Sequence, residues 1–252
     1  RQPLIAVGIW HVENMSIFAI VMIFIAVTTT LFGYRTTFAN TQKEVSPKDE
    51  VLPFNAMTVY VQFFKNKALF CSGMIMILSS IVFGAMSTFI PLYTVREGFA
   101  NAGIFLTIQA ITVVIARFYL RKYVPSDGLW HHRFMMIVLT LLMVASVIVA
   151  FGPHIVSIFV YISAIFIGIT QALVYPTLTT YLSFVLPKIG RNMLLGLFIA
   201  CADLGISLGG VLMGPISDTV GFKWMYILCA LLVTMAMIFS KIRQGQSVSK
   251  AS

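Results

Sequence analysis

Long apolar segments, separated by short charged interruptions, dominate this sequence. They have the length of about 20 residues that a helix needs to cross a hydrocarbon core of about 30 Å. Of the 252 residues 59% are hydrophobic and 10% are charged, which argues strongly against a water-soluble globular domain. The segments are apolar at odd and even positions alike, whereas strands of a membrane barrel alternate. We therefore expect an all-α integral membrane protein.

Seven complete membrane spans are predicted, preceded by the end of an earlier one in residues 3–10. The predicted spans are residues 16–32, 69–93, 102–120, 134–151, 155–182, 193–216 and 224–240. This divides the chain into residues 1–33 with the end of one helix and a full one, a polar linker at 34–67, a six-helix bundle at 68–240 and a tail at 241–252. The opening residues lack a start methionine and a signal-peptide n-region, so the chain looks truncated at its front.

The basic residues predict the orientation of these spans. If the spans alternate in direction, nearly all Lys and Arg residues share one side, and Arg96 and Lys223 lie opposite. By the positive-inside rule that side is cytoplasmic, and it includes the linker and the C-terminus. The net charge of +9 is therefore explained by topology rather than by nucleic-acid binding.

Motifs of soluble enzymes are absent from the sequence. We find no GxxxxGK[ST], GxSxG, HExxH or dinucleotide-binding fingerprint. Cys71, Cys201 and Cys229 lie in apolar segments without the spacing of a metal site or a disulfide framework. We expect a protein that is not an enzyme and that has no cofactor and no metal site.

One carboxylate, Asp203, lies near the middle of the apolar run GLFIACADLGISLGGVLMGP. Such a group costs about 2.5–3.5 kcal/mol to insert, so it usually faces a bundle interior or a wet cavity. It could couple transport to protons by loading and releasing one as its exposure to the two membrane faces alternates. The structural alternative is a hydrogen bond that locks two helices together.

Small residues and prolines surround this carboxylate and recur in the fifth full span. Such residues allow close helix packing or bending. The candidates for packing or bending are Gly205, Gly209, Gly210, Gly214, Pro176 and Pro215.

Polar residues in the spans suggest a substrate cavity. Gln171, Tyr175 and Thr179 follow an i, i+4, i+8 stripe, which either faces substrate or joins helices. Gln109 is a weaker candidate, because an isolated glutamine more often bonds to a neighbouring helix. Arg117 ends the third full span and could either bring a positive charge to the inner mouth of a cavity or anchor the helix at the interface.

The order of elements resembles the C-terminal part of a major facilitator superfamily transporter. A single span, a charged linker and six further spans would be its sixth to twelfth helices. Long strings such as IVFGAMSTFIPLYTV, YPTLTTYLSFVLPK and GRNMLLGLFIACADLGISLGGVLMGPISD resemble the metallophore exporters of that superfamily. The superfamily's GxLxDRxGRR loop is only faintly matched by ARFYLRKYVPSDG, in which Asp127 is displaced.

This resemblance implies secondary active efflux of a nicotianamine-like metallophore across the bacterial inner membrane, by proton antiport and alternating access. The implied partners are the metallophore, protons, the lipid bilayer and the preceding helices of the same transporter, with no nucleic acid. Such metallophores carry several carboxylates, so a basic residue at the cavity mouth is expected. Without the five preceding helices the chain should not complete a transport cycle. A general drug or sugar exporter, or a membrane assembly module that does not transport, are the alternatives.

Overall fold

A computed structural model describes residues 24, 28, 63–64, 66–187 and 191–248, with side chains to residue 243. The chain divides into two units, Arg1–Pro53 and Phe54–Ser252. In the first unit Phe24 and Thr28 are helical, and the Thr28 hydroxyl donates to the Phe24 carbonyl at 2.8 Å. The rest of the predicted span at 16–32, and nearly all of the linker at 34–67, lie outside the described residues.

Among the described residues of the second unit, six helices are long and apolar enough to cross a membrane. They are α3 (Lys67–Glu97), α4 (Ala102–Tyr119), α5 (His132–Ala150), α6 (Ser157–Val185), α7 (Arg191–Thr219) and α8 (Phe222–Val248), with short 3-10 helices η1 (Leu120–Tyr123) and η2 (Gly152–His154). Each predicted span between residues 69 and 240 falls on one of these helices. The all-α membrane fold is confirmed, and α8 continues eight residues into the predicted tail, to Val248.

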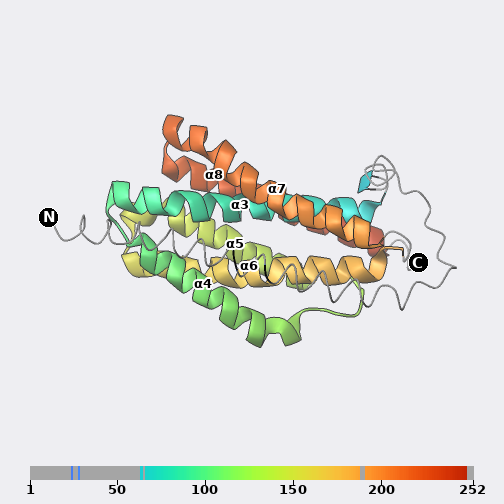
Figure 1. The fold of residues 1–252 in the computed structure, drawn as a ribbon. Helices are drawn as coiled ribbons and strands as arrows, with labels where there is room; N and C mark the ends of the chain where they lie inside the picture. Colours follow the sequence, from blue (N-terminus) through green and yellow to red (C-terminus); the bar gives the residue numbers. More distant parts are fainter. Residues whose placement is uncertain (1–23, 25–27, 29–62, 65, 188–190, 249–252) are drawn as a thin grey trace. The chain divides into compact units, whose positions relative to one another are not determined.

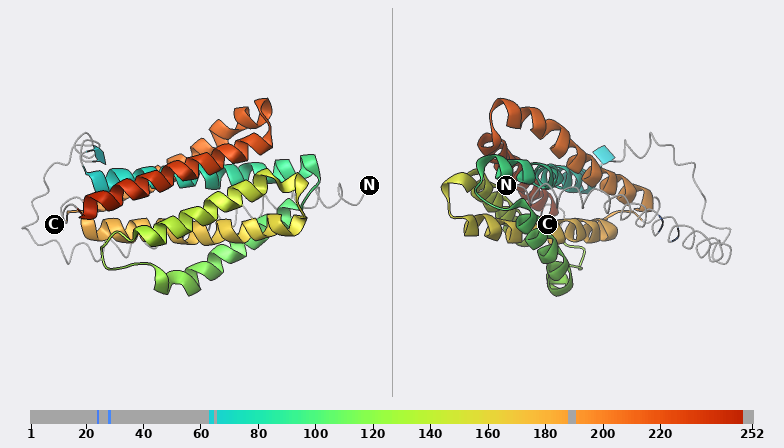
Figure 2. Two further views of the ribbon diagram at one scale, coloured as in Figure 1. Left: turned by 180° about the vertical axis from the view of Figure 1, so that it is seen from behind. Right: turned by 60° about the vertical axis from the view of Figure 1, so that its left-hand side comes forward.

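Helix α3 forms the centre of this bundle (Figure 1). It packs mainly against α7 and α8, while α5 packs against α8 and α6. In the most apolar 18-residue stretch of α3, 83% of the residues are buried. In the corresponding stretch of α4, only 17% are buried. Both views in Figure 2 place α4 at the periphery of the bundle beside α6, which is its main partner. The core is therefore centred on α3, and α4 leaves most of its surface uncovered by the described residues.

Local capping sets where α3 and α4 begin and end. The Asn66 side chain accepts hydrogen bonds from the backbone N–H groups of Ala68 at 3.0 Å and Leu69 at 3.3 Å. Asn101 caps α4 in the same way, through the Ile104 N–H at 3.2 Å. Helix α3 ends at Glu97 and is followed by Gly98, whose φ of 67° is a left-handed conformation that glycine adopts without strain.

Glycines bring α3 and α7 unusually close together. A Cβ atom on Gly209 would lie 2.3 Å from the carbonyl oxygen of Ile81, and one on Gly84 would lie 2.3 Å from that of Ile206. A Cβ on Gly205 would also lie 2.7 Å from the Ile77 carbonyl oxygen. Only glycine allows this backbone approach.

The other candidates for packing or bending differ from these glycines. A Cβ on Gly210 or Gly214 would meet its nearest neighbour at 3.8 Å and 3.7 Å, which are ordinary contacts. Pro176 and Pro215 lie inside α6 and α7, and each helix continues past its proline.

Candidate functional site

A pocket of about 760 Å³ lies between the C-terminal end of α4, η1 and the following loop on one side and α6 on the other. In Figure 1 the end of α4 diverges from α6 at this place. The α4 side contributes the three cations Arg117, Arg121 and Lys122, together with Ser126. The α6 side contributes mainly hydroxyl and small apolar groups. Its polar lining residues are Tyr175, Thr179 and Thr180.

Helices α4 and α6 are held together by a close contact and a hydrogen bond, both at residues that precede the pocket residues in each helix. At Gly168 a Cβ atom would lie 2.8 Å from the Gln109 carbonyl oxygen, so α4 and α6 touch there. The Gln109 Nε2 donates to Gln171 Oε1 at 3.1 Å. Gln109 is 7% exposed, and its own Oε1 has no hydrogen-bond partner among the described residues. The helices therefore meet at these residues and separate beyond them.

The predicted polar stripe of α6 is only partly within the pocket. Tyr175 and Thr179 line it, whereas Gln171 forms the bond to α4 just described. The Tyr175 ring also packs near Phe198 of α7, with 6.2 Å between the ring centroids. The Thr179 hydroxyl donates to the Tyr175 carbonyl at 2.8 Å, which leaves its oxygen able to accept a further bond. Gln109 and Gln171 thus have the geometry of interhelical contacts, and Tyr175 and Thr179 that of pocket residues.

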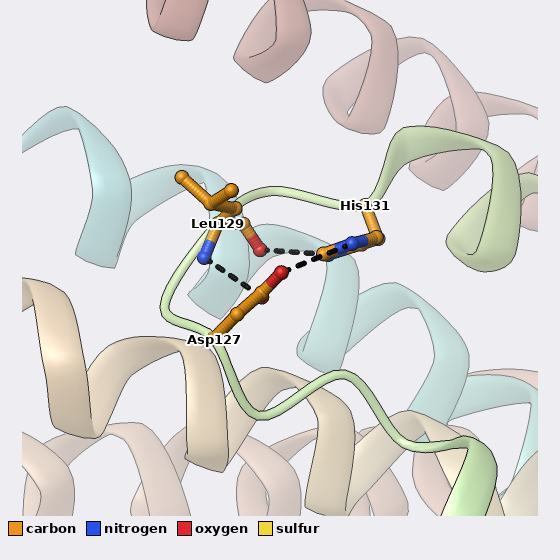
Figure 3. A network of polar contacts seen from close by, with 3 residues as sticks. All are labelled: Asp127, Leu129 and His131. Atoms are coloured by element: carbon orange, nitrogen blue, oxygen red, sulfur yellow. Dashed lines mark hydrogen bonds and ion pairs between the residues drawn. The ribbon is translucent and has the colours of Figure 1, made fainter.

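The pocket is electrostatically positive. Asp127 is the sole acidic residue between positions 102 and 187 of the sequence. Its carboxylate lies 3.3 Å from His131 Nε2 and accepts a hydrogen bond from the Leu129 N–H at 3.1 Å (Figure 3). Within the described part of the chain this is the single ion pair, so no carboxylate pairs with the cations of the pocket.

The Asp127 loop is organised by His131. Its Nδ1 lies 3.1 Å from the Leu129 carbonyl oxygen, and its Nε2 faces the Asp127 carboxylate (Figure 3). Each ring nitrogen of His131 therefore faces an oxygen that accepts hydrogen bonds. This contact keeps the one nearby carboxylate committed to its own loop.

Asp203 lies apart from this pocket. Its side chain is exposed on α7, near the small or polar residues Ser207 and Gly210. The Ser207 hydroxyl donates to the Asp203 backbone carbonyl at 2.9 Å and not to the carboxylate. Within the described residues no group bonds or pairs with that carboxylate. The structure therefore does not bring Asp203 together with the pocket residues.

In the sequence, Arg121 and Lys122 stand out only as charges of a connecting loop. Both line the pocket with Arg117. The spacing of Arg117 and Arg121, i and i+4 on a helix, was a signal that they share one face.

A second group that the sequence did not single out joins the end of α8 to α6. Arg243 Nε donates to the Tyr181 hydroxyl at 2.8 Å, and Arg243 Nη2 also bonds to it. Trp130 packs edge-on against Tyr181 at 5.0 Å and donates through Nε1 to the Ser240 carbonyl at 3.2 Å. These contacts fix the C-terminal turns of α8 beside α6.

Within the described residues, five membrane-length helices packed around the buried helix α3 define a multi-pass membrane protein. The chain belongs to the Major Facilitator Superfamily, whose model matches residues 4–210 and, overlapping them, residues 126–250.

The chain is also 70% identical over 242 residues to the Staphylopine export protein of Staphylococcus aureus. That alignment covers 96% of this chain and 61% of the relative, so the chain spans less than two thirds of the relative's length. No solved structure matches the chain significantly.

Proposed function

We propose that this chain forms the C-terminal part of a secondary active exporter that moves a staphylopine-type metallophore out of the bacterial cell. The observation that carries the proposal is the 70% identity to the Staphylopine export protein over 96% of the chain. Family membership and six membrane-length helices favour transport over catalysis. The positive pocket at the end of α4 favours an anionic cargo over a cationic drug.

In the proposed orientation the protein lies in the plasma membrane, and the linker, the α4–α5 connection and the C-terminus are in the cytoplasm. The distribution of Lys and Arg supports it. Single cysteines introduced at Lys122 and Lys241 should be labelled by an impermeant maleimide in inside-out vesicles only. A cysteine at position 223, in place of Lys223, should react in intact cells. Labelling of the cysteines at positions 122 and 241 from opposite faces of the membrane would reject this topology.

The proposed energy source is a proton gradient, with Asp203 as the group that binds and releases the proton. An exposed carboxylate in a membrane-length helix, without a partner among the described residues, supports this role. Asp203 and the cargo would then be coupled through alternating access, because they occupy separate parts of the bundle.

The test uses the full-length protein in inside-out vesicles with an imposed pH gradient. Wild-type protein should take up the metal-free metallophore. Asp203→Asn should insert normally and lose uptake driven by the gradient. Asp218→Asn is a matched control, because Asp218 is also exposed but lies at the end of α7. Normal gradient-driven uptake by Asp203→Asn would exclude the coupling role, and absence of metallophore movement by wild type would exclude the function itself.

The proposed cargo contacts are Tyr175, Thr179 and Arg117, which share the pocket. Tyr175→Ala should weaken metallophore affinity, because the ring lines the pocket. Gln171→Leu should instead lower stability with little effect on affinity, because its partner is Gln109. Unchanged affinity in Tyr175→Ala would exclude Tyr175 as a cargo contact.

A further inference from the structure

Three cations that have no acidic partner among the described residues occupy one wall of the pocket between α4 and α6. Arg117 lies in the last turn of α4, and Arg121 and Lys122 follow in η1. All three side chains are exposed. Like charges gathered on one wall raise the local positive potential, and an anion that enters relieves their mutual repulsion.

In the part of the chain that the structure describes, nearby groups do not neutralise this wall. The Asp127 carboxylate, the one acidic group of this region, is held by His131 and the Leu129 N–H (Figure 3). The Lys122 ammonium lies over the Tyr123 ring, 5.0 Å from its centroid, which leaves its charge in place. A carboxylate that pairs with these cations would therefore come from outside the described part of the chain.

The chemistry of the walls suits a small polycarboxylate. A guanidinium group presents paired donors that match the two oxygens of a carboxylate, and a lysine adds a compact charge. The opposite wall offers the Thr180 hydroxyl, which has no hydrogen-bond partner within the described residues. A volume of about 760 Å³ falls within the usual range for small-molecule sites.

We propose that Arg117, Arg121 and Lys122 form a capture site for a small di- or tricarboxylate, at the end of the bundle predicted to face the cytoplasm. The inference rests on the proposed function and deepens it: these cations collect the anionic cargo and pass it to the Tyr175 and Thr179 side of the same pocket. Arg121 and Lys122 are thereby assigned to substrate selection as well as to topology. The geometry favours carboxylates at more than one cation, so ligands with a single carboxylate should bind weakly.

The test measures binding to the full-length protein in phosphatidylcholine nanodiscs, with nicotianamine and citrate as probes. Arg121→Gln and Lys122→Gln should each raise the Kd for nicotianamine about tenfold, the size expected for one lost charged contact. Arg121→Lys keeps the charge but loses the paired donors of the guanidinium group, so it should raise the Kd less. Arg133→Gln is the matched control: Arg133 is an exposed cation of the same connection, outside the pocket, and its loss should change Kd less than about twofold.

Salt and lipid measurements separate the sources of anion. Wild-type affinity should fall as ionic strength rises, and this dependence should be shallower in the Arg121 and Lys122 variants. Phosphatidylglycerol in the nanodisc should leave nicotianamine binding nearly unchanged. If it displaces nicotianamine from wild type but not from the Arg121 and Lys122 variants, the cations bind lipid headgroups and the proposal is wrong.

The remaining outcomes distinguish this proposal from the proposed function. If wild type binds and transports the metallophore while Arg121→Gln and Lys122→Gln keep its Kd, the capture site is rejected and the function stands. If wild type binds citrate through these cations but never moves the metallophore, the function is rejected and the anion site stands. Binding of neither probe by wild type overturns both.

Discussion

Replacing Gly209 by alanine should force α7 away from α3. The new methyl carbon would lie 2.3 Å from the Ile81 carbonyl oxygen and 2.9 Å from the Ala85 nitrogen. A carbon–oxygen contact normally needs about 3.3 Å, so the two backbones must separate by about 1 Å. Both close atoms belong to the α3 backbone, so no side-chain rotation relieves the clash.

The energetic cost of this separation can be estimated from packing. A gap of 0.5–1 Å forfeits about a quarter to a half of the dispersion energy at each affected atom pair, and overpacking typically costs about 1–3 kcal/mol. Alanine regains up to about 1 kcal/mol through its better helix propensity. With the full gain in helix propensity, we expect Gly209→Ala to lower the free energy of unfolding by up to about 2 kcal/mol.

Thermal unfolding in detergent, followed with a thiol-reactive fluorogenic maleimide, measures this change. Cys71 and Cys229 are buried and should react only when the helices separate. For a chain of this size each kcal/mol corresponds to about 2–4 °C in Tm. Gly196→Ala is the control, because no atom lies within 4 Å of its added Cβ, and its Tm should stay or rise. A Gly209→Ala protein that unfolds at or above the Tm of Gly196→Ala would refute the close crossing of α3 and α7.

Three further predictions concern single contacts. Asn66→Ala should lower stability by about 1 kcal/mol through loss of the α3 cap, and Asn66→Asp should retain it, as thermal unfolding can compare. Gly98→Ala should lower the free energy of unfolding by about 1–2 kcal/mol, because the Gly98 φ of 67° is left-handed, and Gly98→Asn should lower it less. Equal Tm values for wild type and Gly98→Ala would contradict this strain. Tyr181→Phe should remove the bonds from Arg243 and cost about 1 kcal/mol, with increased proteolysis at the end of α8 as the second readout; unchanged proteolysis would mean that other contacts hold this end.

The sequence alone determined the class of fold and the span positions, because both follow from local properties. Hydrophobic length selects membrane-crossing helices, and these six span predictions needed no knowledge of neighbouring helices. The polar spacing on α6 selected Tyr175 and Thr179 as candidates, and both line a pocket, but their contact with substrate remains a prediction. The orientation and the role of Asp203 remain predictions.

Tertiary structure decided which of several similar residues meet a partner. Gly205, Gly209, Gly210 and Gly214 look alike in sequence, yet only the first two lie in backbone contact with α3. Gln171 follows the α6 stripe, but it bonds to Gln109 on α4.

The cationic wall formed by Arg117, Arg121 and Lys122 also depends on tertiary contacts, so the sequence alone did not reveal it. Arg121 and Lys122 read as topology signals until the divergence of α4 from α6 places them opposite Thr179 and Thr180. Periodicity shows which residues share a face of one helix. It does not show which helix, or which open space, that face meets, because this depends on contacts between residues far apart in the chain.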